Sequence, residues 1–356
     1  MSKVNKKILH VIPSLVIGGA ENLLLNTIQL LRDYEHHVVC FEETTSRIEL
    51  FQEVARVHLK KSSILSLSSF FFIRRLKNKL EPDIIHAHLL KANWLSRIAF
   101  PLSKKLFNSI HSPYGKDAFC FNKLSLLVEA ISFKLSNVKL IFVSDYVKED
   151  YADYISLKNS HFVLHNFVPK EYFALNCVKY AAMSELRLVA VGNIKPLKNY
   201  QLLIDAFKEL RHLPVSIDVY GQGSDLHKFQ EEVTKHKLPI SFKGSIESLM
   251  MVLKEYHALM LPSRYEGFSI ALIEAMAASM PVLLSDIPMF RQLAQKNAYF
   301  FNPEKVEECV QAISEAYKEG FSEEGIVENK EIVINNFSEE IYTKNLLAIY
   351  NEVSEQ

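Results

Sequence analysis

The feature that most constrains the fold is a regular alternation of short apolar runs with longer segments of helical period. The short runs have strand length and β-branched content, and helix-like segments separate them. This alternation predicts βαβ units, and therefore parallel sheets covered by helices. In the first half of the chain the predicted strands are ILHVIP, HHVVCF, ARVHL, DIIHAH, FNSIH, KLIFVS and HFVLHN.

The rhythm restarts after residue 170 with LRLVAVG, VSIDVYG, ISFKG, HALMLP and PVLLSD. The chain has 356 residues, which is more than one hydrophobic core usually supports. We therefore predict an α/β protein with two doubly wound, Rossmann-like domains, at residues 1–168 and 169–337. The weakly polar stretch 169–184 is the expected linker. A C-terminal segment, 338–356, carries a last helix that can cross back to the first domain.

Composition and the N-terminus favour a globular cytoplasmic protein. Apolar residues make up 49% of the chain and charged residues 23%. The N-terminal 22 residues could be mistaken for a secretory signal, but His10, Pro13 and Ser14 interrupt the apolar run and a helical pattern follows. No apolar stretch approaches the roughly 20 residues that span a bilayer. The cysteines are far apart and form no metal or redox pair, which favours a reducing compartment: Cys40, Cys120, Cys177 and Cys309.

The zero net charge hides an asymmetry between the two halves. Residues 1–170 hold 23 Lys and Arg against 15 Asp and Glu, whereas the rest holds 18 against 26. A basic half suits an anionic membrane surface or is simply solvated, and no nucleic-acid motif accompanies it. The segment 69–80 mixes three phenylalanines with arginines and lysines. It is either an interfacial helix at the inner face of the cell membrane or a core-facing helix with a basic outer face.

Glycines mark the carboxyl ends of the predicted strands. Open parallel sheets bind ligands at that edge, where glycine lets the backbone approach a phosphate. Tight turns are the alternative explanation. Eight of the ten glycines have this placement, which favours ligand binding: Gly18, Gly19, Gly115, Gly192, Gly221, Gly223, Gly244 and Gly267.

The first half offers a loop and three histidines as candidates. Gly18-Gly19-Ala20-Glu21 joins the first strand to the first helix and predicts an anion or acceptor loop, although Glu21 could equally stabilise the helix dipole. His86, His88 and His111 end strands, where either a functional or a partly buried structural histidine fits. The Ser-Pro-Tyr-Gly turn after His111 favours function there.

The second half carries sharper signals. In VAVGNIKPLKNYQLLIDAF, Lys195 and Lys198 flank a turn before a helix, which suits phosphates, while solvated lysines are the alternative. Gly221 and Gly223 are expected to form a wall of the nucleotide pocket. In LPSRYEGFSIALIEAM, Glu266 precedes a helix and Glu274 lies eight positions later.

If both glutamates were helical, they would be roughly 12 Å apart along the axis. That exceeds the roughly 5 to 9.5 Å between the carboxyls of a glycosidase. The pair would suit the two ends of a nucleotide-sugar, and a structurally paired Glu274 is the alternative.

With these residues the sequence resembles the retaining glycosyltransferases of family 4, also described as glycosyl transferases group 1. The resemblance implies the GT-B fold, with two Rossmann-like domains facing across a cleft. It implies that Glu266 and the Gly267-Phe268 backbone meet the donor sugar, that Glu274 binds the ribose hydroxyls and that Lys198 meets the diphosphate. It also places His111 near the reacting sugar.

The predicted site follows from motif and resemblance together. Asn193 replaces the arginine usual in the family, so Lys195 would supply the second phosphate charge. The predicted catalytic residues are His111, Lys198 and Glu266, and the acceptor-side residues are Gly18, Gly19, Glu21 and His88. The predicted donor-binding residues are Gly192, Asn193, Lys195, Lys198, Gly221, Gly223, Glu266, Gly267, Phe268, Ser269 and Glu274.

The predicted reaction is transfer from a nucleotide-sugar, with UDP as the first choice, to a glycan or lipid-linked acceptor in envelope polysaccharide synthesis. No Asp-x-Asp triplet occurs in the sequence, so we expect neither a metal nor another cofactor. Two alternatives remain: a nucleotide-sugar epimerase, and a non-catalytic partner subunit that keeps the fold.

Overall fold

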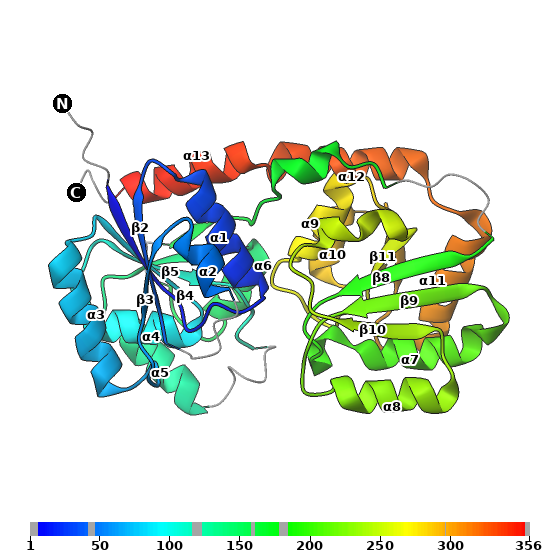
Figure 1. Cartoon of the computed structure of the whole chain (residues 1–356), viewed down its shortest axis with the longest axis horizontal. Coiled ribbons are helices and arrows are strands. Elements are labelled where there is room, and N and C mark those ends of the chain that lie inside the picture. The colour runs from blue at the N-terminus through cyan, green and yellow to red at the C-terminus, as the bar shows by residue number, and fades with distance from the viewer. Residues whose placement is uncertain are drawn as a thin grey trace. The chain divides into compact units, whose positions relative to one another are not determined.

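The chain folds into two compact units (Figure 1). The structure is a computed structural model that describes residues 6–41, 47–115, 123–157, 161–177, 184–295 and 297–352. Unit 1 comprises Met1–Asn166 together with Glu340–Gln356, and unit 2 comprises Phe167–Glu339. The chain therefore passes from unit 1 to unit 2 and returns at its C-terminus.

Unit 1 contains a parallel sheet of seven strands in the order β3-β2-β1-β4-β5-β6-β7. The strands are β1 (Lys7–Val11), β2 (Glu35–Cys40), β3 (Arg56–Leu59), β4 (Ile84–His88), β5 (Leu106–Ile110), β6 (Lys139–Phe142) and β7 (His161–Val163). The helices are α1 (Gly19–Leu30), α2 (Ile48–Gln52), α3 (Leu67–Leu80), α4 (Leu90–Ala99), α5 (Lys123–Lys134), α6 (Asp145–Ala152) and α13 (Glu339–Asn351).

Unit 2 contains a parallel sheet of six strands in the order β10-β9-β8-β11-β12-β13. The strands are β8 (Leu186–Val191), β9 (Val215–Tyr220), β10 (Ile240–Gly244), β11 (Ala258–Leu261), β12 (Val282–Ser285) and β13 (Tyr299–Phe301). The helices are α7 (Tyr200–Glu209), α8 (Leu226–His236), α9 (Ile270–Ala277), α10 (Pro288–Ala294), α11 (Val306–Glu319) and α12 (Glu323–Asn336). Short 3-10 turns are η1 (Lys170–Ala174), η2 (Pro196–Lys198), η3 (Leu210–His212), η4 (Leu249–Met251) and η5 (Leu253–Glu255).

Both sheets reverse their strand order at one point, between β1 and β4 in unit 1 and between β8 and β11 in unit 2. In a parallel sheet the loops on either side of such a reversal diverge, which leaves a crevice at the carboxyl ends of the two strands. Ligand sites in this fold class are therefore expected after β1 and β4, and after β8 and β11.

The buried strands explain why the sequence pattern was informative. Every residue of β4 and β5 is buried, as expected for central strands that helices cover on both faces. The α/β class with two Rossmann-like domains is confirmed. Strand β13 was not predicted from the sequence, because its three residues, Tyr299–Phe301, are too few to show a period.

The C-terminal helix α13 belongs to unit 1 by its contacts. The Tyr342 hydroxyl lies 2.9 Å from the hydroxyl of Thr27 in α1. The Tyr350 hydroxyl lies 2.7 Å from Nδ1 of His86 in β4. Both tyrosines are buried, so α13 completes the core of unit 1 although it follows unit 2 in the sequence.

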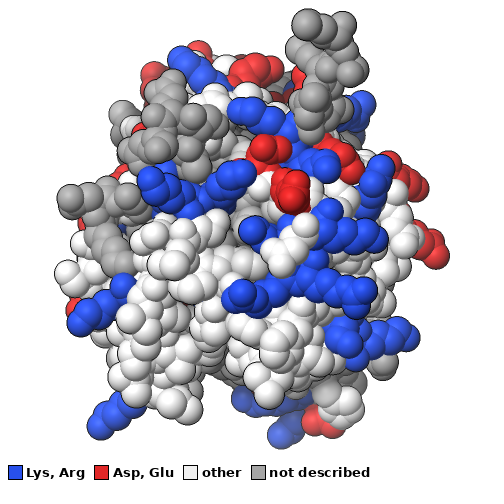
Figure 2. All heavy atoms as spheres, turned by 90° about the vertical axis from the view of Figure 1, so that its left-hand side faces the viewer, with Lys and Arg blue, Asp and Glu red and all other residues white. Residues whose placement is uncertain are grey.

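Charge is unevenly spread over unit 1 (Figure 2). Figure 2 views the left-hand side of Figure 1, and on this face lysine and arginine side chains border a broad uncharged area, while the carboxylates in view gather mainly in the upper part. In the described part of the chain, no helix is both long and apolar enough to cross a membrane.

Candidate active site

The best-defined polar pair of unit 2 lies at the reversal of its sheet. Lys198 follows β8, and Glu266 follows the neighbouring strand β11. The Lys198 Nζ atom lies 2.7 Å from Oε1 of Glu266, and the Ser263 hydroxyl donates to the same oxygen at 2.7 Å. The side chains remain 25% and 10% exposed, so the cation is held at a surface that a ligand can reach.

Glycines let the loops around Lys198 approach one another. Gly192 has φ of +150°, and a β-carbon there would lie 3.0 Å from Cε of Lys198. A β-carbon on Gly221 would collide with the carbonyl of Gly192, and one on Gly223 with the carbonyl of Ile194. These three glycines therefore pack the β8 and β9 loops together beside Lys198, whatever contact they make with a ligand.

Glu274 lies on α9, whose other residues are mostly buried. Desolvation has the larger effect on this carboxyl, and its pKa is raised to about 7. A hydrogen bond from the Tyr172 hydroxyl acts in the opposite direction but is weaker. Tyr172 belongs to η1, within the stretch expected to be a linker, and its hydroxyl also accepts from the Met250 amide at 3.2 Å. A carboxyl with this pKa exchanges its proton near neutral pH, so a ligand hydroxyl could shift its charge state.

The two glutamates are not on one helix. α9 begins at Ile270 with Ser269 as its N-cap, and the Ser269 hydroxyl accepts from the Leu272 amide at 3.4 Å. Glu266 therefore lies in the loop before the helix, and the spacing calculated for two helical positions does not apply.

The remaining predicted donor residues lie along the same two loops. Asn193 and Lys195 are exposed after β8. Gly267 is buried, while the Phe268 ring packs edge-on against Phe337 with 5.4 Å between centroids. This leaves the backbone of 267–268, rather than the aromatic ring, beside Glu266.

The predicted acceptor loop of unit 1 is built around a buried carboxylate. Gly18 is the N-cap residue of α1, and Gly19 is its first residue. Glu21, in the first turn, is 5% exposed, and its carboxylate would collide with a β-carbon on Gly18. Glycine at position 18 therefore leaves room for the Glu21 carboxylate to fold back over the start of the helix.

A row of histidines crosses the centre of the same sheet. Burial lowers the pKa of His10, His36 and His88, and neighbouring imidazoles lower it further, so all three are uncharged at neutral pH. His36 Nε2 lies 2.9 Å from the Leu31 carbonyl, which can only accept, so His36 donates there and its Nδ1 accepts from His10 Nε2 at 3.1 Å. His10 Nδ1 then accepts from His88 Nε2 at 3.4 Å.

This chain of bonds fixes the tautomer of His88. Its Nδ1 carries a free lone pair and has no hydrogen-bond partner among the described residues. His88 ends β4, at the sheet reversal, and its ring centroid lies 6.0 Å from that of His111. Burial lowers the pKa of His111 to about 4, and its Nε2 likewise has no partner within the described ranges. Both imidazoles are therefore neutral hydrogen-bonding groups at neutral pH.

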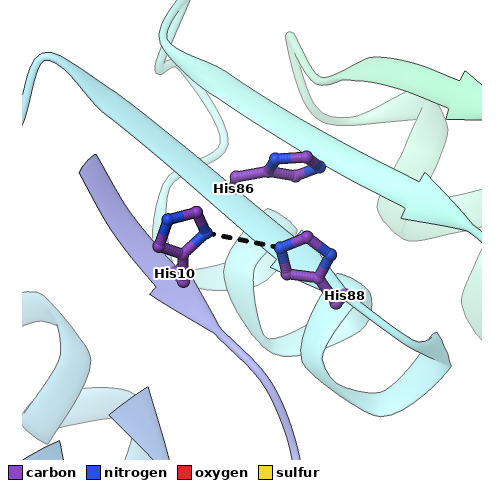
Figure 3. Close-up of side chains that lie close together, drawn as sticks. All are labelled: His10, His86 and His88. Atoms are coloured by element: carbon purple, nitrogen blue, oxygen red, sulfur yellow. Dashed lines mark hydrogen bonds between the residues drawn. The ribbon is translucent and has the colours of Figure 1, made fainter. Parts of the chain in front are cut away.

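His10, His86 and His88 also form a group with metal-ligand spacing (Figure 3). One nitrogen from each lies within 4.8 Å of the other two. However, His10 Nδ1 and His88 Nε2 already bond to each other, and both nitrogens of His86 have partners, Tyr350 at 2.7 Å and Ser109 at 2.8 Å. A metal would have to displace at least two of these bonds, so the hydrogen-bonded network explains the histidines better.

Comparison with known families accounts for both units. The profile described as "Glycosyltransferase Family 4" matches residues 17–172, and the one described as "Glycosyl transferases group 1" matches residues 179–333. The chain belongs to the family 4, group 1 glycosyltransferases. Its two Rossmann-like units are those of the GT-B fold.

Relatives of this glycosyltransferase come from distant organisms. An uncharacterized glycosyltransferase of Methanocaldococcus jannaschii is 26% identical over 288 residues, which cover 76% of each chain. The capsular polysaccharide biosynthesis glycosyltransferase CapH of Staphylococcus aureus is 25% identical over 309 residues, covering 83% of this chain and 84% of CapH. The crystal structure of HepE from Anabaena in complex with UDP-glucose superimposes with a TM-score of 0.81 at 18% identity, covering 98% of each chain.

Several residues that contact the candidate site of this glycosyltransferase were not predicted from the sequence. Tyr172 was hidden in a weakly polar stretch without a period, and nothing local connects it to Glu274. His10 and His36 were not predicted as site residues. His10 lies on β1, which is next to β4, and His36 lies on β2, which is one strand further away. The signal that could have found them is the same-face placement of histidines on adjacent parallel strands.

Proposed function

We propose that this glycosyltransferase moves a sugar, with retention of anomeric configuration, from a nucleotide-sugar to a glycan or lipid-linked acceptor in envelope polysaccharide synthesis. UDP is the proposed donor nucleotide, and the HepE complex with UDP-glucose supports it, as the name of CapH supports the pathway. The donor would bind the loops after β8 and β11, and the acceptor those after β1 and β4. The proposed cellular location of the reaction is the inner face of the cell membrane.

The observation that carries the proposal is the Lys198–Glu266 pair at the sheet reversal of unit 2. In the reaction the acceptor oxygen bonds to the anomeric carbon while the bond from that carbon to the donor phosphate breaks. The acceptor proton passes to the leaving phosphate, whose growing negative charge Lys198 stabilises. Glu266 would orient Lys198 and accept from a sugar hydroxyl, and Glu274 would accept from the ribose.

In unit 1, we assign the acceptor to the edge where Gly18, Gly19 and His88 lie. The free lone pair on His88 Nδ1 is suited to accept from a hydroxyl of the acceptor, and His111 would lie near the reacting sugar. Neither imidazole needs to change charge for these roles, which agrees with their lowered pKa values.

The test is incubation of the purified protein with UDP-, GDP-, ADP- and CMP-sugars and acceptor lipids, followed by mass spectrometry of the products. We expect transfer from one donor class, and the same donor should raise the melting temperature. Conversion of the donor to its epimer without an acceptor would support an epimerase instead. Binding without turnover under all conditions would support a non-catalytic subunit.

A separate prediction concerns metals. Because Lys198, Lys195 and helix N-termini are proposed to neutralise the leaving diphosphate, excess EDTA should leave the transfer rate unchanged. Loss of activity on chelation, with recovery on adding Mn²⁺ or Mg²⁺, would contradict the phosphate assignment. Recovery with Zn²⁺ alone would indicate that His10, His86 and His88 bind a metal ion.

A further inference from the structure

Exposed apolar side chains gather on one part of unit 1. Of the fourteen large hydrophobic side chains that are exposed in the described residues, nine lie on α3, α4, α5 or the residues beside them. Leu67, Leu102 and Leu124 are 77%, 80% and 69% exposed. Single exposed leucines are ordinary, but a cluster of this kind marks a binding surface.

Two hollows follow one another along the line where α3 and α4 pack. The first, of about 520 Å³, is apolar and is lined by Leu67 and Phe70 of α3, Trp94 and Ile98 of α4, and Leu124 of α5, among others. The second, of about 370 Å³, is lined by the next turns of α3, including Arg74 and Lys77, and by the end of α4 with the residues that follow it. We call the two together the α3–α4 groove. Leu67 and Lys77 are ten residues apart on α3, which is about 15 Å along its axis.

The groove changes from apolar to cationic along its length. Arg74 stands at the junction: its guanidinium lies 5.5 Å from the centre of the Phe70 ring and donates to the Ala99 carbonyl at 3.2 Å. Lys104 and Lys105 are exposed beyond α4. Helices α3, α4 and α5 contain one acidic residue, Glu129 of α5, which is buried in an ion pair with Arg97. The three helices therefore carry no exposed carboxylate.

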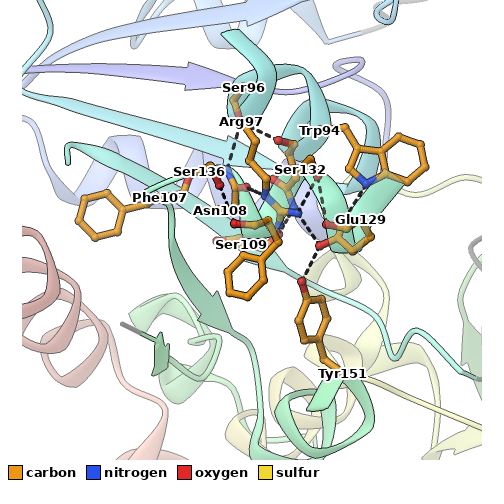
Figure 4. Close-up of polar contacts among 12 residues, drawn as sticks. Trp94, Ser96, Arg97, Phe107, Asn108, Ser109, Glu129, Ser132, Ser136 and Tyr151 are labelled. Carbon is orange, nitrogen blue, oxygen red and sulfur yellow. Dashed lines mark hydrogen bonds and ion pairs between the residues drawn. The ribbon is translucent and has the colours of Figure 1, made fainter. Parts of the chain in front are cut away.

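The apolar wall is held in place by a buried polar network (Figure 4). The Trp94 indole donates to Glu129 at 2.6 Å, and Arg97 donates to the other carboxylate oxygen at 2.5 Å. Arg97 also donates to Asn108 on β5 at 2.6 Å, and the Tyr151 hydroxyl donates to Glu129 at 2.6 Å. The network ties α4 to α5, so the groove exists before any ligand arrives.

From these features we infer that the α3–α4 groove binds one anionic phospholipid of a bilayer and thereby docks unit 1 on the membrane. The apolar part takes a hydrocarbon chain, and Arg74 with Lys77 takes the phosphate. A guanidinium offers a planar pair of donors that matches phosphate oxygens, and the exposed leucines around the groove enter the interface. This gives a site to the membrane location proposed above. It requires no sugar transfer, so its failure would leave the donor chemistry untouched.

The single tryptophan of the chain makes a direct test possible, because Trp94 lines the apolar part of the groove. The full-length protein is mixed with vesicles of phosphatidylcholine, alone or with phosphatidylglycerol, and bound protein is measured by flotation. In a second arm the phosphatidylglycerol carries brominated acyl chains, which quench a nearby indole. We expect binding to the anionic vesicles at low salt and quenching of Trp94.

Variants separate the groove from general adsorption. Leu67→Glu together with Leu124→Glu should weaken binding more than about tenfold, since both side chains lose apolar contact. Arg74→Gln should weaken it about fivefold and reduce its salt dependence, the effect of one basic group near an anionic surface. The matched controls are Met251→Glu and Arg211→Gln in unit 2, which should bind like the wild type. Met251 is 70% exposed.

Three results would overturn the inference. The first is an absence of flotation at low salt. The second is binding without quenching of Trp94, which would indicate headgroup adsorption outside the groove. The third is a concentration-dependent dimer in ultracentrifugation without lipid, abolished by Leu67→Glu, which would assign the face to a second copy of the chain.

Discussion

At the scale of single residues, the proposed donor site depends on a cation, Lys198, whose position is controlled by another residue, Glu266. Lys198 bonds to Glu266, and Glu266 is fixed in turn by Ser263. Removing either partner therefore changes both the charge and the placement of the other. The effects of single substitutions at Lys198 and Glu266 are therefore not expected to add in a double variant.

Lys198 and Glu274 are expected to affect different kinetic constants. Lys198→Ala should lower kcat by about 10² to 10³-fold, because its interaction strengthens as the diphosphate leaves. Glu274→Ala should raise the donor KM more than it lowers kcat, since a ribose contact is similar in the ground and transition states. Glu266→Gln should fall between the two and blur the choice among donor sugars.

The matched control for Lys198→Ala is Lys208→Ala, which removes another ion-paired lysine of unit 2, one bonded to Asp205 and Glu232 on α7 and α8. Each variant is first checked by its melting curve. Wild-type kcat and KM in well-folded Lys198→Ala and Glu274→Ala variants would show that the site is assigned wrongly.

A second prediction at the residue scale follows from the raised pKa of Glu274. The folded-state pKa of about 7 lies above the ordinary 4.5, so the folded protein holds this proton more tightly than the unfolded chain. Below about pH 4.5 the carboxyl is protonated in both states and does not change the free energy of unfolding. As pH rises from about 4.5 to 7, ionisation of the carboxyl lowers this free energy by up to about 3 kcal/mol. Relative to wild type, Glu274→Gln should therefore gain stability between pH 5 and pH 8.

Urea unfolding of both proteins at the two pH values measures this difference, because the other groups titrate alike in each. Glu324→Gln, an exposed glutamate on α12, is the control and should show no such trend. A difference between wild type and Glu274→Gln that is independent of pH would contradict the burial of this carboxyl.

At the scale of elements, the Arg97–Glu129 pair decides how α4 and α5 pack. Both side chains are fully buried. Burial alone would raise the pKa of Glu129, but Arg97 and the hydrogen bonds from Tyr151 and Trp94 overcome this and hold the pKa below its usual range. A lowered folded-state pKa means that the pair stabilises the protein above the ordinary carboxyl pKa, and that this effect is lost as pH falls from there through the folded-state pKa.

We expect Glu129→Gln to cost about 3 to 5 kcal/mol at pH 7, because it leaves Arg97 as a buried charge without its counter-ion. The cost should shrink in acid, where the wild-type carboxyl is also protonated. Chemical unfolding followed by Trp94 fluorescence measures both effects. Asp145→Asn, which breaks the surface pair with Lys148, should cost at most about 1 kcal/mol. Equal costs for the two variants would refute the structural role of the network.

The elements also show what the sequence could and could not predict. The strands of both sheets up to β12 were predicted because each is a buried apolar run between helical periods, as in β4. Lys198 and Glu266 were predicted as site residues from their motifs, and the structure places them together after adjacent strands. Arg97 and Glu129 were not, because a buried ion pair 32 residues apart leaves no local pattern. His10 and His36 were not predicted either, since the row that they form with His88 assembles only when β2, β1 and β4 pair.

At the scale of the whole molecule, the order of the chain differs from the order of its cores. α13 comes last in the sequence, after all of unit 2, but its residues from Glu340 onward belong to unit 1. Tyr350 is buried against His86, and Tyr342 against Thr27. Unit 1 therefore cannot complete its core until the rest of the chain has been made.

This arrangement predicts that the last helix stabilises unit 1 selectively. Removing residues 340–356 should uncover the histidine face and destabilise unit 1 while unit 2 stays folded. Tyr350→Ala should cost about 3 to 5 kcal/mol through lost packing. Tyr350→Phe keeps the ring and leaves His86 Nδ1 without its partner, so it should cost only about 1 to 2 kcal/mol.

Hydrogen exchange distinguishes the units, because protection of the core strands reports the stability of each one separately. The truncated chain should lose protection in β1 and β4 and retain it in β8 and β11. Ile334→Ala, on the α12 surface of unit 2, is the control and should leave β1 and β4 protected. If the truncated chain kept wild-type protection in β1 and β4, α13 would be an accessory of unit 1 rather than part of its core.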